Sequence, residues 1–245
     1  MRPLEKCLIL IDYANFHWEK INMTNLLNYV ISALIKKNIS LYSICIRIYG
    51  GWFYDEVITE QRTEAIKAIA NWPCIIRVID NVYRIKYTFA DSLYVYSDNE
   101  FAQIKRTYIE RKEKLFNIKF RKLENTSKSC KKMNCKVKIV NKWLKSGKAC
   151  TNSDCPEIFS DYFVRFEQKQ VDTHIVVDFI HIIHKLEDHF VFIMSNDIDF
   201  LPCFQYAIVN GMTDRIGLLY RGRLNSYMYD LLTHANILVI QIEEN

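Results

Sequence analysis

Short apolar runs alternate with amphipathic segments along most of the chain. We predict strands at residues 7–11, 41–49, 75–79, 162–166, 190–194, 215–220 and 237–242. Helical spacing of apolar side chains predicts helices at residues 24–37, 55–70, 172–186, 200–209 and 225–234, and residues 81–96 are expected to be extended. Alternating strands and helices are typical of a mainly parallel sheet with both faces covered. The sequence therefore predicts an α/β fold, a three-layer sandwich around a mainly parallel central sheet.

This pattern is interrupted between about residues 105 and 158. Residues 105–148 contain 16 Lys and Arg but 3 Asp and Glu, whereas the rest of the chain has 17 basic and 25 acidic residues. We interpret residues 1–104 and 160–245 as one α/β domain and residues 105–159 as an insertion. Such a concentration of positive charge in one segment indicates a polyanionic partner, and nucleic acid is the first candidate. A solvated charged segment is the alternative.

The insertion also contains two pairs of cysteines, Cys130-x4-Cys135 and Cys150-x4-Cys155, which 14 residues separate. Four thiolates in two close pairs suit tetrahedral zinc, and a bound ion would supply the folding energy that a segment with few apolar residues lacks. The sequence predicts a small structural Zn²⁺ knuckle, and four unrelated thiols are the alternative. The other cysteines lie singly in apolar segments and are predicted to belong to the core: Cys7, Cys45, Cys74 and Cys203.

Acidic side chains follow two of the predicted buried strands. Asp12 and Asn15 come after residues 7–11, and Asp197 and Asp199 come after residues 190–194. Asp172 stands at the start of a predicted helix. Carboxyl ends of parallel strands share one edge of a sheet, where α/β folds place their ligands.

We therefore predict that these side chains meet and hold Mg²⁺ or Mn²⁺, which prefer carboxylate oxygens. Such ions promote phosphodiester hydrolysis. Helix capping is the alternative role for Asp197 and Asp199. Asp178 points about 120° away from Asp172 on an ideal helix. We therefore expect Asp178 to be solvated or to support the site from outside it.

The sequence lacks the motifs of several other classes of hydrolase. No Glu lies between His181 and His184 as in a zinc metalloprotease helix, and no glycines flank Ser195 as in a serine hydrolase. A phosphatase of the haloacid dehalogenase type needs a second Asp where Ala14 stands. No apolar run approaches the length of a membrane span, and the first residues do not form a signal peptide. A cytoplasmic protein with no membrane partner is expected.

Three segments, in order, resemble an NYN domain, the LabA-like branch of the PIN-like nucleases. They are Asp12-Tyr13-Ala14-Asn15, Val171-Asp172, and Ser195-Asn196-Asp197-Ile198-Asp199-Phe200. The resemblance covers about residues 1–104 and 160–245, and Tyr13 and Asn196 stand where the family commonly has Gly. It implies a PIN-like three-layer fold, a Mg²⁺ or Mn²⁺ site and, in active members, endoribonuclease activity. The family often has an acidic residue near the position of Asp178, which leaves the role of Asp178 open.

Together these features predict a metal-dependent nuclease that cuts RNA rather than DNA. Asp12, Asp172, Asp197 and Asp199 would hold the ion, and Asn15 would orient a carboxylate or the scissile phosphate. Basic side chains of the insertion would bind phosphates, and Trp143 would stack on a base or pack on the zinc knuckle. The predicted phosphate-binding residues are Lys128, Lys131, Lys132, Lys136, Lys138, Lys142, Lys145 and Lys148. The alternative is a non-catalytic RNA-binding or adaptor module. The oligomeric state is not readable from the sequence.

The paired cysteines generate a direct prediction about composition. Freshly purified protein should contain about one zinc per chain, because four thiolates complete one tetrahedral site. Replacing Cys130 and Cys135 together should abolish that zinc content. Elemental analysis measures both, and zinc-free wild-type protein would contradict the prediction.

Overall fold

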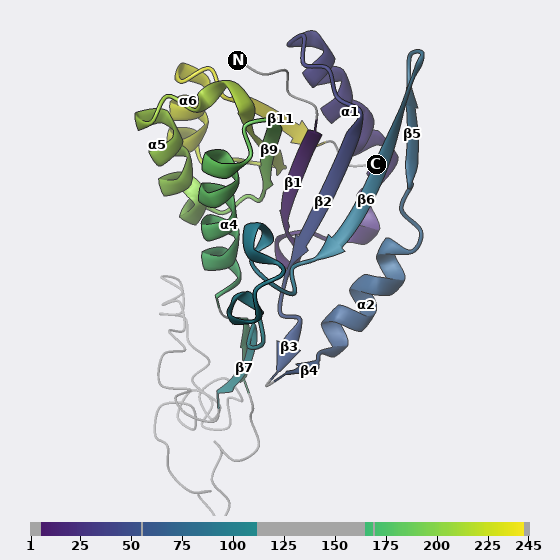
Figure 1. Cartoon of the computed structure of the whole chain (residues 1–245), viewed down its shortest axis with the longest axis vertical. Coiled ribbons are helices and arrows are strands. Elements are labelled where there is room, and N and C mark those ends of the chain that lie inside the picture. Colours follow the sequence, from purple (N-terminus) through teal and green to yellow (C-terminus); the bar gives the residue numbers. More distant parts are fainter. Residues whose placement is uncertain (1–5, 55, 112–164, 169, 243–245) are drawn as a thin grey trace, which may run out of the picture. The chain divides into compact units, whose positions relative to one another are not determined.

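The computed structural model describes residues 6–54, 56–111, 165–168 and 170–242. Seven strands of this part form one sheet (Figure 1). Their spatial order is β11 (Leu238–Ile242), β10 (Ile216–Arg221), β9 (His189–Met194), β1 (Lys6–Asp12), β2 (Ser43–Tyr49), β6 (Asn81–Phe89) and β5 (Ile75–Val78). All neighbouring strands run parallel except β5, which is antiparallel to β6. The predicted α/β fold with a mainly parallel sheet is confirmed.

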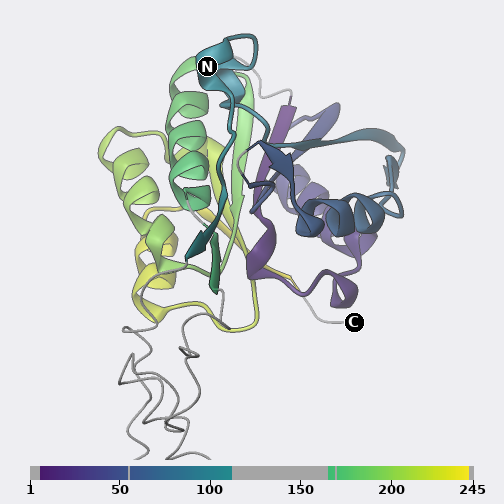
Figure 2. The same cartoon turned by 90° about the horizontal axis from the view of Figure 1, so that it is seen from below.

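Helices cover both faces of this sheet (Figure 2). The longer ones are α1 (Met23–Lys36), α2 (Glu60–Ile69), α4 (Val171–Lys185), α5 (Leu201–Val209) and α6 (Ser226–His234). Successive side chains of a strand point to opposite faces, so β1 contributes to two cores. Cys7, Ile9 and Ile11 pack with α1 and α2, whereas Leu8 and Leu10 pack with α4, α5 and α6.

Short elements connect these helices and strands. The 3-10 helices are η1 (Tyr13–Asn15), η2 (Trp18–Lys20), η3 (Tyr94–Tyr96), η4 (Glu100–Ala102), η8 (Ile198–Phe200) and η9 (Thr213–Arg215). Two-stranded sheets are formed by β3 (Phe53–Tyr54) with β4 (Val57–Ile58), and by β7 (Tyr108–Arg111) with β8 (Arg165–Gln168). No helix of the described residues is long and apolar enough to span a membrane.

The chain divides into two compact units. One combines Met1–Tyr108 with Gln168–Asn245, and the other is Ile109–Glu167. The central sheet and all five longer helices belong to the first unit.

Two predicted elements differ from the structure. The helix predicted at residues 55–70 begins only at Glu60, because the β3–β4 hairpin precedes it and the Thr59 side chain caps it by accepting a hydrogen bond from the Arg62 amide (3.3 Å). Of the strand predicted at residues 162–166, residues 162–164 lie outside the described residues, and residues 165–166 belong to β8, which pairs with β7 and not with the central sheet. Neither pairing follows from local apolar spacing, which does not identify a strand's partner.

The strand register determines which residues lie side by side at the carboxyl edge of the sheet. Asp12 at the end of β1 lies opposite Tyr49 at the end of β2, and Ile11 lies opposite Met194 at the end of β9. The residues that follow β1 and β9 therefore leave the sheet side by side.

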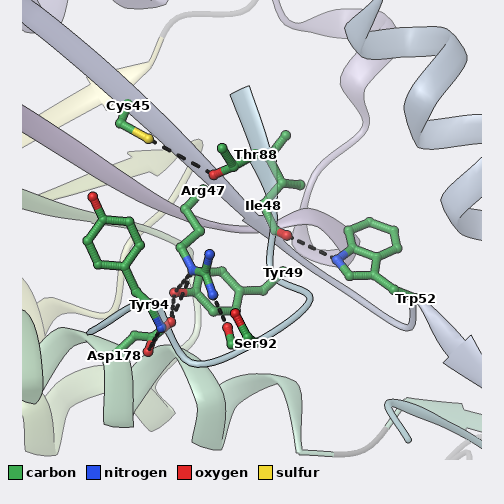
Figure 3. A network of polar contacts seen from close by, with 9 residues as sticks. All are labelled: Cys45, Arg47, Ile48, Tyr49, Trp52, Thr88, Ser92, Tyr94 and Asp178. Atoms are coloured by element: carbon green, nitrogen blue, oxygen red, sulfur yellow. Dashed lines mark hydrogen bonds and ion pairs between the residues drawn. The ribbon is translucent and has the colours of Figure 1, made fainter. Parts of the chain in front are cut away.

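A buried ion pair attaches α4 to the sheet (Figure 3). One carboxylate oxygen of Asp178 accepts hydrogen bonds from Arg47 Nε (3.1 Å) and the Tyr49 hydroxyl (2.5 Å). The other accepts from the Tyr94 amide (2.7 Å), and Arg47 also donates to the Ser92 carbonyl. The network links β2, α4 and the segment that leads into η3.

Asp178 is thus fully buried, and the expectation of a solvated side chain is wrong. Helical spacing gave its direction on α4, but not the presence of Arg47 on the facing strand. Its two oxygens are occupied by Arg47, Tyr49 and Tyr94, so Asp178 supports the fold that presents the edge.

Removing Asp178 should be strongly destabilising, because Arg47 would remain buried without its counter-charge. We expect Asp178→Ala to lower the free energy of unfolding by about 3–5 kcal/mol. The Arg47→Met, Asp178→Ala double variant should lose less than Asp178→Ala alone. Denaturant unfolding measures these changes, with Asp230→Ala as an exposed control in α6 that should change stability by less than about 0.5 kcal/mol. A loss below about 1 kcal/mol for Asp178→Ala would contradict this role.

Candidate functional site

Asp12 and Asn15 form the base of the site. Asp12 ends β1 and is only 4% exposed. The chain then turns through η1, which brings Asn15 back so that its Nδ2 donates to Asp12 Oδ2. The same Nδ2 lies 3.2 Å from the Ser195 hydroxyl, to which it also donates. Asn15 therefore joins the end of β1 to the end of β9.

Ser195 organises the loop that follows β9. Its buried hydroxyl accepts hydrogen bonds from Asn15 and from the Asp197 amide (3.1 Å). Its own amide donates to the Leu219 carbonyl in β10 (3.1 Å). Asn196 exchanges two 2.9 Å hydrogen bonds with the backbone of Arg221. These contacts fix the loop on both sides.

Sequence reasoning missed the supporting roles of Ser195 and Asn196. Ser195 was weighed only as a hydrolase nucleophile, and Asn196 only as a departure from a family pattern. The available signal was a pair of small polar residues between a fully apolar strand and two carboxylates.

The two acidic residues after β9 occupy different positions. Asp197 is partly buried, and its Oδ1 accepts a hydrogen bond from the Asp199 amide (3.0 Å) at the start of η8. Asp199 is exposed. The capping role considered for this pair therefore belongs to Asp197.

The carboxylates influence one another electrostatically. Burial raises the pKa of Asp12 to about 6, the Asn15 hydrogen bond opposes this shift, and the charges of Asp172 and Asp197 add to it. Asp172 lies in the first turn of α4, and desolvation followed by the charges of Asp197 and Asp199 raises its pKa. The structure thus brings all four predicted acidic residues into one neighbourhood.

Positive charge does not balance this acidic group. Among the described residues, no Lys or Arg forms an ion pair with Asp12, Asp172, Asp197 or Asp199. Asp178 makes the contrast clear, since Arg47 compensates its charge directly. Clustered carboxylate oxygens without a counter-charge suit a hard divalent cation.

Carboxylate oxygens are suitable ligands for such an ion, but the side chains are not arranged around a common ion position. Within the described ranges, no three His, Cys, Asp or Glu side chains are grouped so that they could hold a metal ion. Asp12 is fixed by Asn15, whereas Asp172 and Asp199 are exposed at the edge. Coordination of an ion would therefore require the exposed carboxylates to turn toward Asp12.

The histidines of α4 and β9 contact other groups, and the His181 ring packs edge-on against Tyr96 with centroids 5.0 Å apart. His184 contacts the Tyr206 hydroxyl (2.7 Å), and His189 contacts Asp188 (2.7 Å) at the first residue of β9. His189 is at the amino end of β9, whereas the acidic group lies beyond its carboxyl end. None of these contacts connects a histidine to that group.

The predicted zinc ligands and phosphate-binding side chains lie outside the described residues. They are Cys130, Cys135, Cys150 and Cys155, with Lys128, Lys131, Lys132, Lys136, Lys138, Lys142, Trp143, Lys145 and Lys148.

The four single cysteines are described. Cys7 and Cys203 are buried and Cys45 is partly buried, but Cys74 is exposed. The prediction that all four belong to the core is therefore wrong for Cys74, which stands just before the edge strand β5.

Comparisons with protein-family models, with curated proteins and with solved structures find no match to this chain.

The raised pKa of Asp12 generates a prediction for the protein without divalent ions. The pKa is about 6 in the folded state and about 4 when unfolded. Stability should therefore fall as the pH rises from about 4 through 6, because ionisation is more costly in the folded state. Asp12→Asn removes this cost. The variant should match the wild type near pH 4 and exceed its stability by up to about 3 kcal/mol above pH 6.5.

Urea unfolding across this pH range measures the difference. Asp80→Asn is the control, because it removes an exposed carboxylate from the β5–β6 turn. Equal stability of Asp12→Asn and wild type at every pH would contradict the burial of an uncompensated charge at Asp12.

Proposed function

We propose that this protein is a metal-dependent nuclease that hydrolyses RNA. The observation that carries the proposal is the acidic group at the carboxyl ends of β1 and β9, with Asp12 buried in it and no Lys or Arg of the described residues paired with it. A parallel α/β sheet binds ligands at this edge. The resemblance to NYN domains, with their PIN-like three-layer fold, supports the same function.

Each residue of the group has a role in the proposal. Asp12, Asp172, Asp197 and Asp199 hold one or two Mg²⁺ or Mn²⁺ ions. When bound, such an ion activates water and stabilises the leaving oxygen of a phosphodiester. Asn15 orients the Asp12 carboxylate, and Ser195 positions Asn15 by accepting its second hydrogen bond.

The insertion has the complementary role. The acidic edge alone repels a phosphate backbone, whereas the segment 105–148 carries 16 Lys and Arg. Its lysines attract the RNA, and a zinc knuckle with four cysteine ligands orders the segment. Both assignments belong to the proposal.

One observation favours a second candidate, a non-catalytic RNA-binding or adaptor module. No metal-ligating group is preformed among the described residues. Such a module keeps the zinc and the basic segment but needs no ion at Asp12. RNA binding without cleavage would then be the whole activity.

Cleavage of labelled RNA separates the two candidates. Single-stranded and hairpin RNAs are incubated with Mn²⁺ or with EDTA. Wild type should cut only with Mn²⁺, and the Asp12→Asn, Asp197→Asn double variant should lose roughly 100-fold or more of the rate, because both side chains are ion ligands in the proposal.

The matched control is the Asp80→Asn, Asp214→Asn double variant, which removes the same charge. Both control residues are exposed and precede the amino ends of β6 and β10, opposite the acidic edge. This control variant should cleave both RNAs at the wild-type rate. Binding of both RNAs without cleavage, equal in wild type and in the Asp12 and Asp197 variant, would favour the adaptor module.

A further inference from the structure

A pocket lined by aromatic side chains lies beside the acidic edge. Its volume is about 480 Å³, within the range of small-molecule sites. One wall is Tyr13, Phe16 and Trp18 from the segment after β1, and the other includes Glu64 of α2 and Trp72. Tyr13 directly follows Asp12, and consecutive Cα atoms are about 3.8 Å apart. The pocket therefore begins one residue from the proposed ion ligand.

The aromatic rings of this pocket are held in place. Tyr13 and Trp18 stack with centroids 5.1 Å apart and planes inclined by 17°, and Trp72 lies 5.2 Å from Trp18. The indole N–H of Trp18 donates to the Tyr13 carbonyl (2.8 Å). Trp18 and Phe16 are each 8% exposed. This packing covers most of Trp18 and Phe16, so the partly buried rings of Tyr13 and Trp72 are the ones left to stack on a planar group.

Polar side chains complete the lining: Glu19, Glu64, His17 and Asn71, with His17 Nδ1 3.6 Å from Glu19 Oε1. Glu19 and Glu64 both line the pocket, and both are exposed residues. Burial raises the pKa of Tyr13, and the charges of Glu64 and Glu19 raise it further, so both carboxylates lie close to the Tyr13 ring. Paired carboxylates accept hydrogen bonds and repel phosphate. An occupant must therefore be planar and present N–H donors.

We propose that this aromatic pocket binds an unpaired guanine base of the RNA whose phosphate lies at Asp12. The proposal rests on the proposed function and adds its base preference. Unpaired RNA bases are commonly read by stacking on aromatic side chains and by hydrogen bonds to the Watson–Crick edge. Guanine presents two adjacent donors there, N1–H and the N2 amino group, which match a carboxylate acceptor. Adenine and cytosine place an acceptor beside their amino donor, and uracil places its single N–H between two acceptors.

Aromatic rings with carboxylates also suit a methylated ammonium group. We favour a base, because Tyr13 and Trp18 stack on each other and leave no space between their rings for a cation, although Trp72 is tilted by 48° to Trp18. The pocket also adjoins Asp12, where the proposed function places an RNA phosphate. A trimethyllysine peptide therefore enters the experiment as a competitor.

The experiment measures binding of fluorescein-labelled UUGUU and UUUUU RNA to the full chain in buffer without added Mg²⁺ or Mn²⁺, by fluorescence anisotropy. Wild type should bind UUGUU roughly tenfold more tightly. The Glu19→Gln, Glu64→Gln double variant should bring that ratio close to one. The Glu100→Gln, Glu187→Gln double variant removes the same charge at two exposed positions outside the pocket and should keep the ratio.

Equal affinity of wild type for the two RNAs would overturn the proposal, and so would a preference that survives in the Glu19 and Glu64 variant. Displacement of UUGUU by the trimethyllysine peptide, lost in that variant, would assign the pocket to a methylated ammonium group instead. Because no Mg²⁺ or Mn²⁺ is added, base preference is measured independently of nuclease activity. A protein that does not cleave RNA can still show the guanine preference, and a protein that cleaves RNA can lack it.

Discussion

Convergence of negative charge at one edge of a parallel sheet is the constraint on which this structure depends. Two neighbouring strands, β1 and β9, end at the same level; β1 ends in Asp12, and β9 is followed by Asp197 and Asp199. Asp12 is buried there without a basic partner among the described residues. Folding alone would not favour that arrangement, because burying an unpaired charge is unfavourable. The Asn15–Ser195 bridge and the Asn196–Arg221 contacts maintain it. A divalent cation would supply the missing positive charge.

Two buried acids, Asp178 and Asp12, differ in how their charges are compensated. Asp178 lies on the same side of the sheet as Asp12, and Arg47, Tyr49 and Tyr94 satisfy its oxygens. This compensated pair anchors α4, whose first turn presents Asp172 to the edge. The uncompensated acid is the one available for chemistry. Tyr13, the first residue after Asp12, lines the aromatic pocket, so in our proposals the same short segment would contact both the base and the phosphate of a nucleotide.

Local pattern predicted much of this arrangement. The buried runs before Tyr13 and Ser195 identified β1 and β9. The electrostatic coupling of Asp12 with Asp172 and Asp197 agrees with acidic residues close to one another, but no three of them are grouped to hold a metal ion among the described residues, so the metal site stays a prediction. Long-range contacts were not predictable in the same way. Arg47 lies on a strand 131 residues before Asp178, and no spacing rule pairs them. The β3–β4 hairpin and the β7–β8 pairing were missed because a strand's partner is a property of the whole fold.

The central claim is that the carboxylates at this edge hold a divalent cation. Anomalous diffraction from a crystal of the full chain soaked in MnCl₂ tests it most directly, because Mn²⁺ is located without reference to activity. The account predicts a peak about 2.0–2.3 Å from an Asp12 carboxylate oxygen, with Asp172 or Asp197 completing the coordination. A map with no peak at Asp12 under saturating Mn²⁺ would contradict it and leave the acidic edge without an ion.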